Sequence, residues 1–364
     1  MKLVFFDDPS DPDLLEADAI VRRWPSAAIM QAPVWPTLAA PSRLQSYRFF
    51  VCRDEAGEVI SSGCVRLTHL YPGRFAAALK RGPCTKTPED LVRVMPLLEA
   101  ALRDIGAISI AVNPHWQDEA AARCESLLSD GGYIRVPRHE QTLPTATAMI
   151  DVTASEEKIL SGFSQRRRRD LRMTGDKAVE VRPVKTREDA VRLSRIMKEM
   201  AASTGMETDS QHDFVAHFQV LGDNPNAGTM NAAYVGGVLL GGSVCYREAE
   251  RSCALLVATS PGMRGSGRST ALYWQNVLDA KRLGCTELDL VGYPDPRLAH
   301  SGRAAGRQQF KDSFRPQIVI LPPIMVKALR PLEARLYQRV RRLYRQSPLR
   351  PRLKAILQRR RGKA

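Results

Sequence analysis

A stretch rich in glycine and arginine, residues 260–270, has the composition of an anion-binding turn. It reads SPGMRGSGRST and lies between an apolar run, CALLVAT, and a run with helical periodicity, ALYWQNVLDAKRLG. In a strand–turn–helix arrangement, backbone N–H groups and the helix N-terminus gather beside Arg264 and Arg268, which suits a phosphate or pyrophosphate. A turn with no ligand is the alternative, because short Gly/Arg loops are common.

A second concentration of positive charge precedes this turn in the chain. Four consecutive arginines occupy positions 166–169, and Arg172 follows on the same predicted helix. Arginine pairs bidentately with phosphate oxygens, so the cluster can line a nucleic-acid backbone. A solvated helix face is the alternative, although one amphipathic stripe cannot hold four consecutive residues.

Other reaction chemistries have little support in the sequence. The six histidines form no His-Glu-x-x-His pattern and the seven cysteines include no Cys-x-x-Cys pair, so we predict neither a metal site nor a disulfide framework. Neither a Gly-x-Ser-x-Gly elbow nor a Walker A loop occurs. Moving an acyl group onto an amine remains plausible chemistry, because it requires positioning and oxyanion stabilisation rather than an enzyme nucleophile.

An internal repeat indicates the elements that position these residues. The segments GEVISSGCV (57–65) and GGVLLGGSV (236–244) share a Gly-x-Val-x-x-x-Gly-x-Val pattern and lie 179 positions apart. Gly106 and Gly284, each between a predicted helix and a predicted strand, lie 178 positions apart. Two features at nearly the same offset predict a duplicated α/β unit.

The chain of 364 residues is long enough for two domains. The helix predicted between residues 88 and 106 carries Leu91, Val94, Leu98 and Leu102 at helical spacing. The predicted fold class is α/β with mixed sheets (α+β). We place one domain at 1–147, a second at 148–320, and a basic C-terminal helical tail at 321–364.

The tail carries most of the net charge. Residues 327–364 hold fourteen Lys and Arg against the single Glu333, which is +13 of the total +15. An apolar stripe at helical spacing predicts that a tail helix docks on the first domain, and it consists of Leu329, Leu332, Leu336, Val340 and Leu343. The remaining basic arm suits tRNA or an anionic membrane surface, with a solvated helix as the alternative.

No signal peptide and no apolar run of membrane-spanning length occurs in the sequence. We therefore expect a cytoplasmic protein. Contact with the inner surface of a membrane through the basic tail is a further expectation.

Several segments resemble, in order, the FemABX-like family of aminoacyl-tRNA-dependent transferases that build peptidoglycan cross-bridges. The resemblance covers roughly residues 25–325. It implies two tandem domains like the Gcn5-related N-acetyltransferases (GNAT). The segments that carry it are MQAPVW, LKRGPCTKTPEDL, GAISIAVNP, AMIDVTASEEKILSGFSQRRRRDLR, GCTELDLVGY and GRQQFKDSF.

The resemblance also implies roles for individual residues. Lys311, preceded by Phe310, would lie in the acceptor and acyl channel, where a lysine can pair with a phosphate or offset an oxyanion. Asp289 would accept a proton or orient the amine. Without the family context, both residues are ordinary surface or strand-end charges. Predicted substrate-binding residues are Gln31, Trp35, Arg264, Arg268, Tyr293 and Phe310, and predicted tRNA-binding residues are Arg166, Arg167, Arg168, Arg169 and Arg172.

Three functions follow as hypotheses. The first is an aminoacyltransferase that uses charged tRNA as co-substrate, needs no cofactor, and acylates the amine of a peptidoglycan precursor (lipid II peptide) or a small biosynthetic amine. The second is an N-acyltransferase of the GNAT superfamily that uses acyl-CoA, motivated by the turn at 260–270. The third is a non-catalytic adaptor that binds a membrane surface or nucleic acid.

Overall fold

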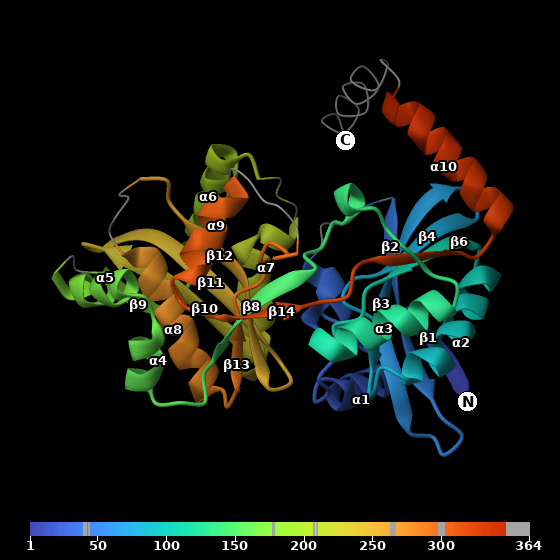
Figure 1. The fold of residues 1–364 in the computed structure, drawn as a ribbon, viewed down its shortest axis with the longest axis horizontal. Coiled ribbons are helices and arrows are strands. Elements are labelled where there is room, and N and C mark those ends of the chain that lie inside the picture. Colours follow the sequence, from blue (N-terminus) through green and yellow to red (C-terminus); the bar gives the residue numbers. More distant parts are fainter. Residues whose placement is uncertain are drawn as a thin grey trace.

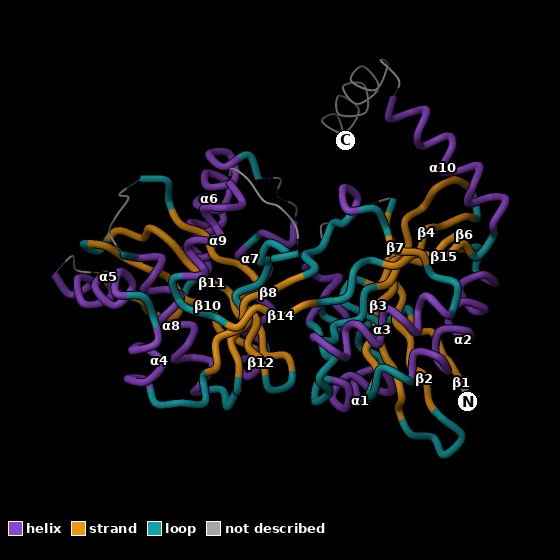
Figure 2. Tube along the Cα trace, in the orientation of Figure 1, coloured by secondary structure: helices purple, strands orange, loops and turns teal. Residues whose placement is uncertain are grey.

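The computed structural model describes residues 1–38, 42, 44–176, 179–206, 208, 210–262, 267–297 and 303–346. It contains two mixed β-sheets that lie side by side (Figure 1). Helices surround both sheets (Figure 2). The fold is therefore mixed α/β, as the sequence predicted.

The first domain is built on an eight-stranded sheet of order β1-β2-β3-β4-β6-β15-β7, in which β5 pairs with β3. Among the described strand pairs of this sheet, β4 and β6 are parallel and all the others are antiparallel. The strands are β1 (Lys2–Phe6), β2 (Gln45–Arg53), β3 (Val59–Tyr71), β4 (Arg74–Leu79), β5 (Cys84–Thr85), β6 (Ala107–Val112), β7 (Ile134–Arg135) and β15 (Met325–Ala328), and the helices are α1 (Pro12–Val21), α2 (Asp90–Asp104) and α3 (Asp118–Asp130).

The second domain has a seven-stranded sheet of order β14-β8-β13-β12-β11-β10-β9. Its strands are β8 (Ala146–Asp151), β9 (Val179–Pro183), β10 (Gly228–Val235), β11 (Val238–Glu248), β12 (Arg251–Thr259), β13 (Glu287–Asp289) and β14 (Gln317–Ile320). Its helices are α4 (Glu156–Gly162), α5 (Gln165–Asp176), α6 (Arg187–Thr204), α7 (Phe214–Asp223), α8 (Arg268–Arg282) and α9 (Arg303–Asp312), and α10 (Pro331–Gln346) follows β15.

The predicted duplication is confirmed. Three antiparallel strands lead through a helix to a parallel strand in both domains, as β2-β3-β4-α2-β6 and as β10-β11-β12-α8-β13. Gly106 and Gly284 end the two helices with φ angles of +97° and +72°. Glycine adopts this left-handed conformation without the steric cost of a Cβ atom, which explains its presence at both equivalent positions.

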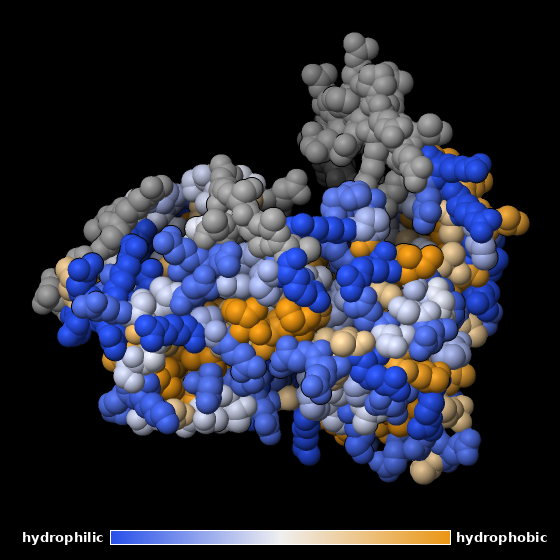
Figure 3. Space-filling view, in the orientation of Figure 1, coloured by the Kyte–Doolittle hydropathy of each residue, from blue (hydrophilic) through white to orange (hydrophobic). Residues whose placement is uncertain are grey.

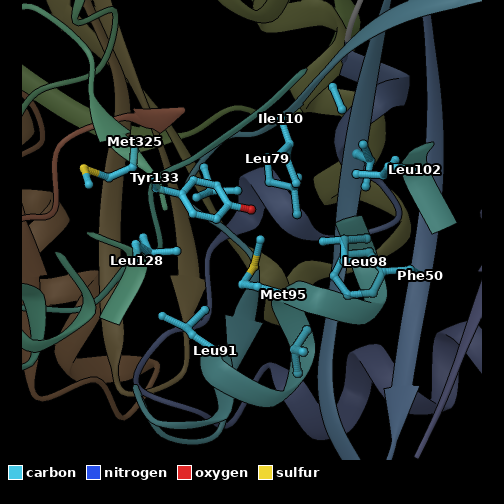
Figure 4. Packing of buried hydrophobic residues seen from close by; sticks show 14 of the residues in the cluster. Phe50, Leu79, Leu91, Met95, Leu98, Leu102, Ile110, Leu128, Tyr133 and Met325 are labelled. Carbon is cyan, nitrogen blue, oxygen red and sulfur yellow. The ribbon is translucent and has the colours of Figure 1, made fainter. Parts of the chain in front are cut away.

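The first core lies between α2 and its sheet (Figure 4). Leu91, Val94, Leu98 and Leu102 are all buried, which confirms the helical spacing read from the sequence. Met325 of β15 belongs to the same cluster. A residue from the C-terminal part of the chain thus completes the core of the N-terminal domain.

The second sheet is covered on both faces. Neighbouring residues of a strand point to opposite faces, and on β11 Val244 packs with α6 and α7 while Cys245 packs with α8. The sheet is therefore the middle layer of the second domain.

The chain returns to the first domain after β14 (Figure 1). There β15 inserts between β6 and β7, a strand that the sequence did not predict. At the other junction β8 begins at Ala146, two residues before the position at which we divided the domains.

Helix α10 follows β15 along the first domain, but the predicted apolar stripe does not dock it. Leu329 and Ala334 are buried, whereas Leu332, Leu336 and Val340 are 81%, 65% and 56% exposed. The prediction was wrong for these three side chains, because the small Ala334 is on the side that approaches the sheet. The side chain of Leu343 and residues 347–364 lie outside the described part of the chain.

A buried polar cluster joins the two domains. Glu248 of β11 accepts a hydrogen bond from the Ile29 backbone N–H at 2.8 Å, and Arg251 of β12 donates to the Ala27 carbonyl at 3.0 Å. Arg251 also lies 3.4 Å from Glu248 and 3.1 Å from Nδ1 of His115. Burial and the neighbouring arginines hold the pKa of His115 well below its ordinary value. The domain interface thus contains the buried ion pair of Arg251 and Glu248, with the neutral imidazole of His115 beside it.

Candidate active site

The second sheet opens where β12 and β13 diverge. The two strands pair only from Arg251–Cys253 to Glu287–Asp289, and β12 continues to Thr259. In the first sheet the equivalent strands stay paired from Phe75 to Leu79. Within the described chain the strands therefore part in the second domain and not in the first.

Asp289 lies at the point of divergence. Its buried carboxylate accepts hydrogen bonds from the hydroxyl of Thr147 and from the backbone N–H of Val291 at 2.7 Å. Val291 and Gly292 have φ angles of +52° and +62°. A β-branched residue in the left-handed region is strained, and such strain gathers at functional sites.

Lys311 of α9 approaches the same turn. It is 9% exposed, and its ammonium donates to the carbonyl oxygens of Val291 and, at 3.2 Å, Gly292. Both predicted catalytic residues therefore hydrogen-bond to one strained turn, Asp289 from the end of β13 and Lys311 from α9. Their catalytic roles stay predictions.

Tyr293 follows the turn and is also buried. Its hydroxyl donates to Asp312 and accepts a hydrogen bond from Gln308 at 3.2 Å. Burial and the Asp312 carboxylate raise the pKa of Tyr293, which keeps its hydroxyl protonated as a donor. The sequence pointed to Tyr293 but not to Asp312, Gln308 or Thr147, because their partners are distant in the chain.

One cavity adjoins this site, and a second cavity shares part of its lining. One of about 600 Å³ is lined by Gly292 and Tyr293 together with three arginines, Arg135, Arg138 and Arg297. Another of about 820 Å³ lies against β3, β4, β6 and α10 of the first domain. Val136, Thr142 and Leu143 line both cavities, so one segment at the domain junction separates them.

Asp295 fixes the wall of the smaller cavity. Arg297 and Thr145 donate to its carboxylate at 2.5 and 2.7 Å, and, against the opposing effect of burial, these bonds lower the pKa of Asp295 to about 2.

Asp295→Asn should therefore destabilise the protein by about 1 kcal/mol at neutral pH, a value reduced for solvent screening of a partly exposed pair. A carboxylate with a lowered folded pKa stabilises above its unfolded pKa, and the contribution is lost as pH falls from about 4 to about 2. Urea unfolding of parent and variant at about pH 7 and about pH 3 measures this. If parent and variant differed in free energy of unfolding by the same amount at both pH values, the lowered pKa of Asp295 would be contradicted.

The arginine cluster divides in two. Arg167 is buried, where it donates to Ser313 at 2.7 Å and to Asp170 and Thr270 at 2.8 Å. It therefore differs from the predicted exposed phosphate track and holds α5 against α8 and α9. The members that do face solvent are Arg166, Arg169 and Arg172, while the half-buried Arg168 donates to the Ser161 carbonyl at 2.9 Å.

Two aromatic residues predicted to bind substrate are packed in cores. Phe310 lies against Tyr273 and Phe314 with ring centroids 5.4 and 5.2 Å away, and the guanidinium of Arg167 lies over its ring at 4.5 Å. Trp35 is buried in the cluster of α6 and α7. Direct substrate contact by either residue stays a prediction.

Gln31 supports a turn of the first domain. Its side-chain amide donates to the Lys80 carbonyl at 2.7 Å, and Gly63 and Gly82 lie so close that a Cβ on either would collide with it. The next residue in that turn, Arg81, is buried and donates to the Pro144 carbonyl at 2.9 Å. Gln31 thus supports the turn from which Arg81 contacts Pro144, a residue just before β8 at the domain junction.

The turn at 260–270 joins β12 to α8, so the predicted strand–turn–helix arrangement is confirmed. Arg268 is the first residue of α8 and donates to the carbonyls of Ser260 and, at 2.6 Å, Gly262. Arg264 lies outside the described residues.

Among the described residues, no group of three or more His, Cys, Asp and Glu side chains could hold a metal ion. None of the described helices has the length and apolar character needed to cross a bilayer. All seven cysteines are buried free thiols.

Residues 163–311 match the acetyltransferase (GNAT) domain family. The structure resembles FemX with a TM-score of 0.78 at 13% identity, covering 92% of this chain and 99% of FemX. It resembles L-PGS from Bacillus licheniformis (TM-score 0.52, 14% identity, 88% and 92% coverage) and a tandem GNAT protein from the clavulanic acid biosynthesis pathway (0.52, 12%, 90% and 99%). No curated protein sequence matches the chain.

Likeness at such low identity shows the fold, and the family match at 163–311 supports the activity class. The chain therefore has two tandem GNAT-like domains, and a GNAT acetyltransferase domain in the second of them supports an acyltransferase-type activity.

Proposed function

We propose that this protein is an aminoacyltransferase that moves an aminoacyl group from a charged tRNA to an amine acceptor. The observation that carries the proposal is that Asp289 and Lys311 both hydrogen-bond to the backbone of the Val291–Gly292 turn, where the strands diverge beside the smaller cavity. The likeness to FemX over nearly the whole of both chains supports it.

In this reaction the acceptor amine attacks the ester carbonyl of the aminoacyl-tRNA. A C–N bond forms, the ester C–O bond breaks, and the amine proton passes to the departing ribose oxygen. Lys311 would offset the charge on the carbonyl oxygen. The carboxylate of Asp289 already accepts two hydrogen bonds and has further lone pairs with which to orient the amine.

The charges of the described surface suit two anionic substrates. Arg166, Arg169 and Arg172 on α5 are exposed and available to a phosphate backbone. Three arginines line the cavity beside Tyr293 and suit the phosphates of a tRNA end or of an acceptor. The cavity next to the turn is therefore a candidate site for either anionic substrate.

A second function is favoured by the β12–α8 connection. Gly267 caps α8 with a φ of +84°, and a helix N-terminus at the end of this connection suits the pyrophosphate of an acyl-CoA. The GNAT domain match over 163–311 supports the same alternative, an acyl-CoA-dependent N-acyltransferase.

Incubation with a total charged-tRNA pool and candidate amines separates the two. We expect amide product that disappears when RNase is added before the amine, because the acyl donor is then destroyed. Mass spectrometry of the product measures it, with acyl-CoA supplied in parallel. Product that survives RNase and requires acyl-CoA would refute the tRNA-dependent function.

A further inference from the structure

Helix α10 presents an apolar stripe to solvent. Leu332, Leu336 and Val340 are spaced by four residues, so they lie on one side of the helix. They are 81%, 65% and 56% exposed and are three of the large apolar side chains that the described surface leaves in water. Exposing such an apolar stripe to water is unfavourable in free energy, and patches of this kind mark interaction sites.

The other side of α10 is already occupied. Ala334, Tyr337 and Gln338 line the larger cavity of the first domain. Glu333 anchors the helix by accepting hydrogen bonds from Arg74 at 2.6 Å and from Tyr71 at 2.9 Å. The stripe is therefore not a displaced piece of the core, since the helix already packs through its opposite face.

Positive charge accompanies the stripe. Arg335 and Arg339 are exposed and adjoin it, one residue before Leu336 and Val340 respectively. In the sequence, α10 carries no acidic residue after Glu333. Figure 3 shows hydrophilic and hydrophobic side chains next to each other where α10 runs along the edge of the first domain.

We propose that this face of α10 docks on the surface of a bilayer rich in anionic lipid. An interfacial helix needs an apolar face to enter the headgroup boundary and basic side chains beside it to meet the lipid charge. A second copy of the chain would bring like charges together around the stripe. A nucleic acid would pair with the arginines and leave the leucines in water.

Sedimentation of the full chain with vesicles tests the proposal. We expect binding to vesicles in which about a third of the phosphatidylcholine is replaced by phosphatidylglycerol, and at least about tenfold weaker binding to phosphatidylcholine alone. Leu332→Gln/Leu336→Gln/Val340→Gln should weaken binding to the anionic vesicles by at least about tenfold. Arg335→Gln/Arg339→Gln should weaken it by about fivefold for each charge removed.

The matched control is Val92→Gln/Ile134→Gln, which removes two apolar side chains that are 58% and 72% exposed elsewhere on the first domain. This control should bind vesicles as the parent does. All these side chains are exposed, so the variants should keep the parent's melting temperature.

Equal binding to both kinds of vesicle, or unchanged binding by the triple variant, would overturn the proposal. So would a parent dimer in gel filtration that the triple variant abolishes, because a second copy would then cover the stripe. Vesicle binding uses no enzymatic readout, so its result stands apart from that of the tRNA experiment.

Discussion

Replacing Lys311 with methionine should lower kcat by about 10²- to 10³-fold, the loss seen when one group that stabilises an oxyanion is removed. Methionine matches the aliphatic part of the lysine side chain but lacks the ammonium, which is buried against the carbonyls of Val291 and Gly292. The remaining fold should survive, because the aliphatic part of the side chain still packs. Turnover with the substrate identified by the RNase experiment measures the effect.

Lys281→Met is the matched control. Lys281 also donates to two backbone carbonyls, those of Val152 and Ala154 at 2.8 and 2.5 Å, but it does so near the C-terminal end of α8. Both variants should lose a similar amount of stability, and only Lys311→Met should lose turnover. If the two variants lost activity in proportion to stability, Lys311 would be a structural residue.

Replacing Arg251 with methionine should have the largest effect on stability, a loss of about 3–5 kcal/mol. The change removes the cation that pairs with Glu248 and leaves that carboxylate buried and uncompensated. Burial already raises the pKa of Glu248, and Arg251 opposes the rise. Urea unfolding of parent and variant gives the difference in free energy of unfolding.

The double variant Glu248→Gln/Arg251→Met serves as the control. Glutamine keeps an oxygen for the Ile29 backbone N–H but carries no charge, so the double variant should recover at least about 2 kcal/mol relative to Arg251→Met. Equal stability of the single and double variants would mean that the buried charge is not the cause.

The duplicated architecture could be read from the sequence because both copies repeat the same local requirements. Gly106 and Gly284 occupy equivalent left-handed positions, and the valine and glycine pattern recurs in β3 and β11. The assignment of Asp289 and Lys311 to one catalytic site followed from a family resemblance, not from spacing. Twenty-two positions separate them, and only the fold of α9 back onto the turn brings them together.

Contacts between distant segments could not be predicted in the same way. Thr147 reaches Asp289 because β8 pairs with β13. Arg167 points inward because it donates to Thr270 of α8 and to Ser313, which directly follows α9. The exposed stripe of α10 has the same periodicity as a buried one, and a helical pattern alone does not say which face meets the sheet.

The position of β15 also bears on how the protein is made. β7 pairs with β15, and β15 separates it from β6, so the sheet of the first domain stays incomplete until residues 325–328 exist. A ribosome adding about 5–20 residues per second needs about 10–40 s to travel from β7 to β15. The sheet of the first domain therefore keeps an open edge while the ribosome synthesises the whole second domain, because its last strand follows that domain in the chain.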